Sequence, residues 1–173
     1  MSVEDSSPPA PSGSHRTAFG AAPLDDVDRR LLAELERDGR ISNKELAALA
    51  GIAPSTCHAR VRALRESGVL RGFHAQVDPE AVGRGLQAMI AVRVQPSARA
   101  RLAEVAHRLA QRPEVRDVYL LAGADDVLVH VAVRDSRQLR SFVLEHLSTR
   151  PEVAHTQTSL VFEHLHAPGT AAL

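Results

Sequence analysis

The sequence predicts an α+β protein with two parts, an N-terminal winged helix-turn-helix and a C-terminal ferredoxin-like βαββαβ sandwich. Three observations lead to this prediction. Residues 42–65 have the pattern of two short helices joined by a tight turn, which is typical of a helix-turn-helix. Residues 86–165 alternate between strand-like and helix-like patterns. Within them, one four-residue motif recurs where each helix-like segment ends.

Composition sets the broad class. The 173 residues suffice for two small domains, and 44% hydrophobic residues suffice for packed cores. Basic and acidic residues balance at 21 each, which argues against a uniformly basic protein but leaves room for a local basic face. No apolar run is long enough to span a membrane, and the N-terminus lacks a signal-peptide pattern. We therefore expect a cytoplasmic protein.

Shifts in composition set the expected domain boundaries. Residues 1–23 are rich in Ser, Pro, Ala and Gly, so we expect a disordered tail there. The winged helix-turn-helix is expected over residues 24–78, followed by a linker over 79–85. The sandwich is expected over residues 86–165, and a C-terminal tail over 166–173.

The first two helices carry clear start and stop signals. The first is expected over residues 24–38, with Asp25 or Asp26 as its cap and Gly39 as its stop. The second begins after Ser42, because a glutamate three residues later completes a capping box. It ends at a glycine, Gly51, which suits the left-handed backbone at a helix end.

The third helix begins at Pro54, because proline is tolerated in a first helical turn. Ala53 then occupies the N-cap, where a missing polar side chain should cost roughly 1 kcal/mol of stability. The only cysteine, Cys57, cannot form an internal disulfide, and its position predicts a buried, reduced thiol. The inward apolar stripe consists of Cys57, Val61 and Leu64.

Residues 69–78 are expected to form two short strands around Gly72, the wing of a winged helix. Charge is distributed unevenly around it. Residues 24–38 contain six acidic and three basic residues, whereas residues 51–74 contain one acid against four arginines and two histidines. The third helix and the wing therefore form the basic side, where a nucleic acid is expected to bind.

The hydrophobic pattern of residues 86–165 predicts strands and helices in the order β-α-β-β-α-β. Its strands are expected over residues 86–94, 115–121, 127–133 and 156–165, and its helices start at Pro96 and at Asp135 or Ser136. The sequence Arg-Pro-Glu-Val recurs at residues 112–115 and 150–153, after each helix, as a split β-α-β repeat requires. The sheet face without helices is expected to be buried against a second subunit.

The chain resembles the Lrp/AsnC, or feast/famine, regulators from Leu24 to about His164. The resemblance rests on LDDVDRRLLAELERDGRISNKELAALAGI, the Arg60-Val61-x-x-Leu64 pattern, and Gly68-Val69-Leu70-x-Gly72-Phe73 with a later Gly123-x-x-Asp126. It implies a winged helix that binds DNA and a C-terminal domain that forms dimers and higher assemblies. It also implies a small effector, usually an amino acid, between the C-terminal domains.

The expected partners are double-stranded DNA with a pseudo-palindromic operator and further copies of the chain, as a dimer, tetramer or octamer. Arginines should supply phosphate contacts, and side chains on the third helix should reach base edges. Arg60, near the middle of this helix, and His58 are expected to lean toward the groove. DNA contacts are expected from Asn43, Ser55, Thr56, His58, Ala59, Arg60, Arg62, Arg65 and Arg71.

An amino-acid effector requires a carboxylate for its amino group and free N–H groups for its carboxylate. Asp126 could supply the first, and a turn around residues 155–158 the second. Family members commonly have an aromatic residue where this chain has Asp125, so the pocket is expected to be altered, to prefer a basic ligand or to be unused. The expected effector residues are Leu121, Gly123, Asp125, Asp126, His155, Thr156, Gln157 and Thr158.

We expect no metal site, no catalytic residues and no cofactor, because the histidines do not cluster and no nucleophile triad is apparent. Two alternatives remain open. A sirohaem decarboxylase of the same fold would work on an anionic tetrapyrrole in the cleft between the domains. An architectural protein would compact DNA in the nucleoid without an effector. The clustering of basic residues around the third helix favours a DNA-binding regulator over the enzyme.

Overall fold

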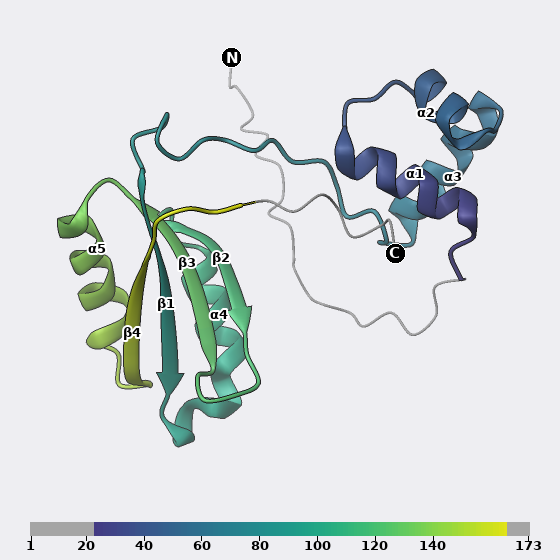
Figure 1. Ribbon diagram of the computed structural model, residues 1–173. Coiled ribbons are helices and arrows are strands. Elements are labelled where there is room, and N and C mark those ends of the chain that lie inside the picture. Colours follow the sequence, from purple (N-terminus) through teal and green to yellow (C-terminus); the bar gives the residue numbers. More distant parts are fainter. Residues whose placement is uncertain (1–22, 166–173) are drawn as a thin grey trace, which may run out of the picture. The chain divides into compact units, whose positions relative to one another are not determined.

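The computed structural model describes residues 23–165, which form two compact units (Figure 1). The first unit comprises residues 23–73 and the second residues 74–165. The predicted tails lie outside the described residues, except Pro23.

Three helices make up the first unit: α1 (Asp26–Arg37), α2 (Asn43–Ala50) and α3 (Pro54–Glu66). Capping boxes start α1 at Asp25 and α2 at Ser42, as their sequence spacing predicts. Gly51 ends α2 with a φ of 71°, in the left-handed region that favours glycine. The three helices share one core, whose fully buried members are Leu31, Leu35, Leu46, Ala47, Ala50 and Cys57.

The predicted wing strands are not formed, because residues 69–78 contain no strand. The segment packs back onto the helices instead of pairing with itself. The Leu70 N–H donates to the Leu64 carbonyl at 2.9 Å, and the Phe73 ring lies so close to Gly39 that a β-carbon there would come within 2.9 Å of it. An isolated two-stranded hairpin is only marginally stable, and residues from His74 onward belong to the second unit.

The second unit is a four-stranded antiparallel sheet with strand order β2-β3-β1-β4. Its strands are β1 (Leu86–Val94), β2 (Val115–Leu120), β3 (Val127–Val133) and β4 (Val153–Val161). A 3₁₀ turn (Pro96–Arg101) leads into α4 (Leu102–Ala110), and α5 (Ser136–Val143) continues into a π-helical turn (Leu144–Ser148). The order of elements is the predicted β-α-β-β-α-β.

Both helices of the second unit cover the same face of the sheet, since one core joins them to alternate residues of β1 and β3. The Arg-Pro-Glu-Val repeat ends both helices in the same way. The Arg112 and Arg150 N–H groups each donate to a leucine carbonyl at 3.0 Å, and the valine three residues later donates back to the arginine carbonyl at 3.0 Å. Buried residues of this core include Ile90, Val92, Val127, Val129, Val131, Val133, Phe142 and Leu147.

The last strand begins earlier than predicted. Val153 pairs with Val94 across an irregularity in the ladder, so β4 spans Val153–Val161 rather than residues 156–165. On the sheet face away from the helices, pairing places Met89 opposite His130 and Ala91 opposite Leu128. His130 is buried, and its ring nitrogens lie 3.3 Å from an Asp117 oxygen and 3.0 Å from a Gln87 oxygen.

Candidate functional site

One face of α3 presents basic side chains to solvent. His58, Arg62 and Arg65 are exposed on this face, and Arg71 from the segment after the helix lies beside them. Together with Val61, Glu66 and Leu70 they line a shallow hollow of about 600 Å³. We call His58, Arg62, Arg65 and Arg71 the basic face. It brings together four of the nine predicted DNA-contacting residues.

Only one arginine of the basic face is tied to an acid. The Arg62 Nε donates to a Glu66 carboxylate oxygen at 2.7 Å, between two largely exposed side chains. Within residues 23–165, no carboxylate forms an ion pair with Arg65 or Arg71. Such guanidinium groups can neutralise phosphates, whose contacts provide most of the affinity of a DNA-binding protein.

The start of α3 lacks a side-chain cap, as predicted from Ala53. Ser55 and Thr56 are exposed in the first turn, and neither caps the helix. The first N–H groups of an uncapped helix are suited to binding a phosphate. Asn43 faces this turn: its side-chain amide donates to the Pro54 carbonyl at 2.9 Å and so ties the start of α2 to the start of α3. Ala59 is exposed on α3.

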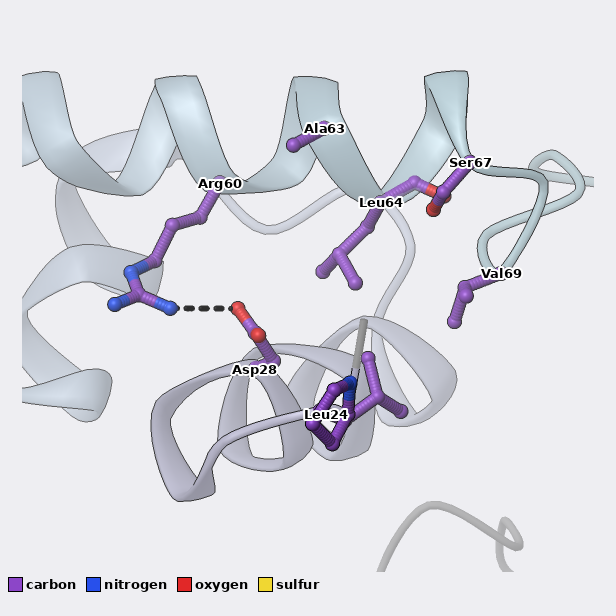
Figure 2. A pocket seen from close by; sticks show the side chains of 8 residues that line it. Leu24, Asp28, Arg60, Ala63, Leu64, Ser67 and Val69 are labelled. Atoms are coloured by element: carbon purple, nitrogen blue, oxygen red, sulfur yellow. Dashed lines mark hydrogen bonds and ion pairs between the residues drawn. The ribbon is translucent and has the colours of Figure 1, made fainter. Parts of the chain in front are cut away.

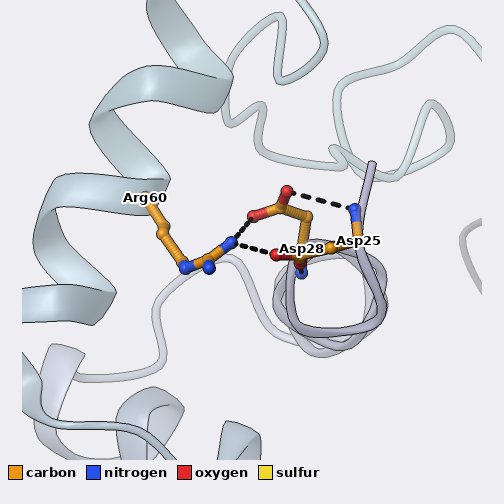
Figure 3. Close-up of polar contacts among 3 residues, drawn as sticks. All are labelled: Asp25, Asp28 and Arg60. Carbon is orange, nitrogen blue, oxygen red and sulfur yellow. Dashed lines mark hydrogen bonds and ion pairs between the residues drawn. The ribbon is translucent and has the colours of Figure 1, made fainter. Parts of the chain in front are cut away.

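Arg60, which was expected to lean toward the DNA groove, is engaged by two carboxylates of its own chain. Its Nη1 donates to the Asp25 Oδ2 at 2.7 Å and to the Asp28 Oδ1 at 2.9 Å, at the start of α1 (Figure 3). Two carboxylates outcompete solvent for one guanidinium whose side chain is only 34% exposed. We call Arg60, Asp25 and Asp28 the clamp.

The pKa values of the clamp shift in the directions expected for an ion pair. Asp28 and then Asp25 raise the pKa of the Arg60 guanidinium above its usual value. The Asp28 backbone N–H lowers the pKa of Asp25, and Arg60 lowers it further. Because the folded-state pKa of Asp25 is depressed, its stabilising contribution is present above the unfolded value near 3.8 and is lost as pH falls through the folded value.

A second hollow lies beside the clamp, between α1 and the C-terminal half of α3 (Figure 2). Its volume is about 220 Å³. Asp28 and Arg60 close one end of it, and the remaining walls are mostly apolar. Its lining consists of Pro23, Leu24, Asp28, Arg60, Ala63, Leu64, Ser67 and Val69.

The loop from β2 to β3 contains four of the eight predicted effector residues, but Asp126 already makes contacts within the fold. This side chain is buried, and its Oδ2 accepts the Val94 N–H at 2.9 Å. Its other oxygen lies 3.6 Å from the Arg99 Nε. Its backbone N–H donates to the Val92 carbonyl at 3.0 Å. The carboxylate that was expected to bind the amino group of an effector is therefore already hydrogen-bonded to the last residue of β1.

Two arginines that the sequence reasoning missed border this loop. Besides Arg99, the Arg93 Nε donates to the Ala124 carbonyl at 2.8 Å, and its Nη2 lies 3.5 Å from an Asp125 oxygen. Leu121 and Gly123 are exposed, and a β-carbon added to Gly123 would meet no atom within 4 Å. The signal was available in the sequence, because Arg93 is the one charged residue in the apolar β1 strand.

Residues 155–158 form part of β4, not a turn, which corrects the prediction. Their pairing with β1 sends His155 and Gln157 to one face of the sheet and Thr156 and Thr158 to the other. Because ladder pairing occupies part of their backbone N–H groups, they cannot act together as a free anion-binding loop. These four side chains therefore divide between the two faces of the sheet, two on each.

Cys57 is fully buried, as predicted. Burial raises the pKa of its thiol. Over residues 23–165, no group of three or more His, Cys, Asp or Glu side chains could hold a metal ion. No helix in this same range is long and apolar enough to cross a membrane.

Two family models match the chain. One, described as winged helix-turn-helix DNA-binding, covers residues 24–71, and the other, described as Lrp/AsnC ligand binding domain, covers residues 87–169. The HTH-type transcriptional regulator AldR of Mycolicibacterium smegmatis is 56% identical over 145 residues, which cover 84% of this chain and 85% of that protein.

Solved structures agree with these matches. The crystal structure of MtbAldR is 48% identical, with a TM-score of 0.71, and the match covers 85% of this chain and all of that one. A transcriptional regulator of Neisseria meningitidis, solved as a complex with L-Met, is 31% identical with a TM-score of 0.75. That match covers 84% of this chain and 94% of the other.

Proposed function

Since the chain belongs to the Lrp/AsnC family of transcriptional regulators, we propose that its α3 helix and the basic face dock on operator DNA and that a small metabolite modulates this binding. The observation that carries the proposal is the basic face itself. Four basic side chains share one hollow, and two of the arginines have no carboxylate partner among the described residues. Ser55, Thr56 and the uncapped first turn of α3 add donors for a phosphate.

We further propose that the protein acts as a homodimer or a larger even-numbered assembly on a pseudo-palindromic operator. The sheet face with Met89, Ala91 and Leu128 supports this, because apolar side chains lie there opposite the helices. Two copies related by a twofold axis present two α3 helices to two half-sites, which matches the symmetry of a palindrome.

For the effector we propose an amino acid, on the strength of the L-Met complex of the Neisseria regulator. The Arg93 and Asp125 side chains at the loop offer one cationic and one anionic group to such a zwitterion. We also propose that the protein works in the cytoplasm with its chromosome, is not an enzyme and needs no cofactor. A second candidate is an architectural DNA-binding protein that needs no effector. The hydrogen bond from Val94 to Asp126 favours it, because this carboxylate is then already used within the fold.

The test of DNA binding starts by selecting tight-binding duplexes from a random pool with the full-length protein. The Kd of a selected duplex is then measured by fluorescence anisotropy over a range of salt concentrations, for the unaltered chain and for Arg65→Ala and Arg71→Ala. Each variant should bind more weakly, and the slope of log K against log [salt] should fall by about 1, as for a lost phosphate contact. Lys44→Ala is the matched control, because it removes a cation from the exposed surface of α2 away from the basic face.

Unchanged affinity and slope in both arginine variants would remove α3 from the DNA interface. Thermal-shift and binding measurements with the common amino acids then separate the two candidates. A regulator should be stabilised by one of them and change its Kd for DNA, whereas an architectural protein should show neither effect.

A further inference from the structure

The clamp and the cap of α1 are built from the same two carboxylates. Asp25 accepts the Asp28 N–H through Oδ1 at 2.8 Å and Arg60 through Oδ2. Asp28 accepts the Asp25 N–H through Oδ2 at 3.4 Å and Arg60 through Oδ1. Each carboxylate thus uses one oxygen to start α1 and the other to hold α3, so the start of one helix sets the position of the other (Figure 3).

The shared apolar core, with Leu31 and Leu35 of α1 and Cys57 of α3, also joins the two helices, and the clamp adds a polar contact to it. Toward the C-terminal half of α3, the hollow of about 220 Å³ separates the two helices (Figure 2). At the other end, α3 has no side-chain cap, and the Asn43 amide ties it to α2 rather than to α1. The clamp is therefore a polar contact that resists rotation of α3 about its own axis relative to α1.

We propose that Asp25 and Asp28 are positioning residues for specific DNA recognition, acting through Arg60; this inference rests on the proposed DNA-binding function. Arg60 lies three residues after the buried Cys57 and four before the buried Leu64, on the inner side of α3. The basic face lies on the outer side of the same helix. Fixing the inner side fixes the direction in which the outer side chains approach base edges, because supporting hydrogen bonds hold a recognition site in its geometry.

The sign of the effect separates positioning from simple electrostatics. Asp25 and Asp28 are negative charges in a unit proposed to approach DNA phosphates. Electrostatics alone predicts that removing them strengthens binding, because carboxylates repel phosphates. If the clamp positions α3, removing them weakens binding to the specific site.

The experiment compares the full-length chain with the Asp25→Asn/Asp28→Asn double variant. Asparagine caps helices about as well as aspartate, so α1 keeps its start while the negative charges of the clamp are lost. Kd is measured for a selected duplex and for a scrambled duplex of the same length, both at the same salt concentration. We expect the Kd of the selected duplex to rise about fivefold to tenfold and that of the scrambled duplex to change less than about twofold, so the specificity ratio falls.

Two further variants sharpen the result. Arg60→Met should lower the specificity ratio to a similar extent without changing the salt slope, whereas loss of a phosphate contact would lower the slope by about 1. The triple variant should be no weaker than Arg60→Met, because members of one unit are not additive. Glu34→Gln is the control: it removes one acid from α1, and its partner is Arg37 on the same helix rather than α3. Its specificity ratio should not fall.

Circular dichroism confirms that each variant is folded at the assay temperature, and Asp28→Asn alone answers the question if the double variant unfolds. Unchanged or tighter specific binding by the folded aspartate variants overturns the inference and leaves the proposed function intact. A drop of about 1 in the salt slope of Arg60→Met also overturns it, since Arg60 would then contact phosphate. An unaltered chain that binds no duplex overturns the proposed function and this inference with it.

Discussion

Asp126 shows how a single side chain can hold a loop in place. Its carboxylate accepts the N–H of Val94, a residue only 1% exposed, and its backbone bonds to Val92 on the same strand. The side chain itself is 12% exposed, so water cannot readily replace it. Asp125, its neighbour, instead points to Arg93 at 3.5 Å from a more exposed position. Two adjacent aspartates therefore differ in what they contribute to stability.

Replacing Asp126 by alanine should lower the free energy of unfolding by about 1–3 kcal/mol, because the buried Val94 N–H then lacks an acceptor. Asp125→Ala is the matched control and should change it by less than about 1 kcal/mol, as for a partly exposed ion pair. Urea unfolding followed by circular dichroism measures both. Equal losses in the two variants would show that the Val94 contact does not stabilise this loop.

At the level of elements, α3 combines an exposed basic face with few constraints of its own. Its N-cap position has the extended backbone of a normal cap, with φ −68° and ψ 146°, but Ala53 offers no acceptor. Its position depends on neighbouring elements: Asn43 of α2 at its start and the α1 capping residues at its middle. The strands β1 and β3 differ in this respect, because their pairing in the sheet fixes which face each side chain occupies.

Ala53→Ser should stabilise the protein by about 1 kcal/mol, because the backbone at this position already suits a cap and the serine hydroxyl can accept an N–H of the first turn. Chemical denaturation, followed through the unfolding transition of the first unit, measures the increase in the free energy of unfolding. Ala59→Ser, on the exposed side of the same helix, is the control and should be neutral or slightly destabilising. A stabilisation that is equal in both variants would contradict a capping effect.

The whole molecule divides at Phe73 into two units with separate cores. The helical unit has the basic face, and the sheet unit has the loop with Asp125 and the apolar face proposed for assembly. In our proposal, the helical unit thus binds DNA and the sheet unit forms the assembly. Linking two DNA-binding units through one assembly raises affinity without any new DNA contact.

Residues 1–73 and 74–173, produced separately, should therefore each fold, because each unit has its own buried core. The helical fragment should bind the selected duplex about 100-fold or more weakly than the full chain, since it loses bivalent binding. Circular dichroism and anisotropy measure folding and affinity, and sedimentation gives the assembly state of the other fragment. A helical fragment that binds as tightly as the full chain would show that assembly does not contribute to DNA affinity.

Local patterns were enough to predict every feature whose partner atoms lie within a few residues. The caps at Asp25 and Ser42, the end at Gly51, the missing cap at Ala53 and the order of strands and helices all follow from short spacing rules. The wing strands were the exception, because whether a hairpin forms depends on what it packs against.

The roles of Arg60 and Asp126 depended on contacts between distant residues. Arg60 meets Asp25 across 35 positions in the sequence, and Asp126 meets Val94 across 32. Arg60 fits the inward spacing between Cys57 and Leu64 as well as Val61 does, but a charge is placed inward only where an opposite charge lies within reach. The partners Asp25 and Asp28 lie at the start of another helix, so only the folded chain could show that this arginine pairs with them.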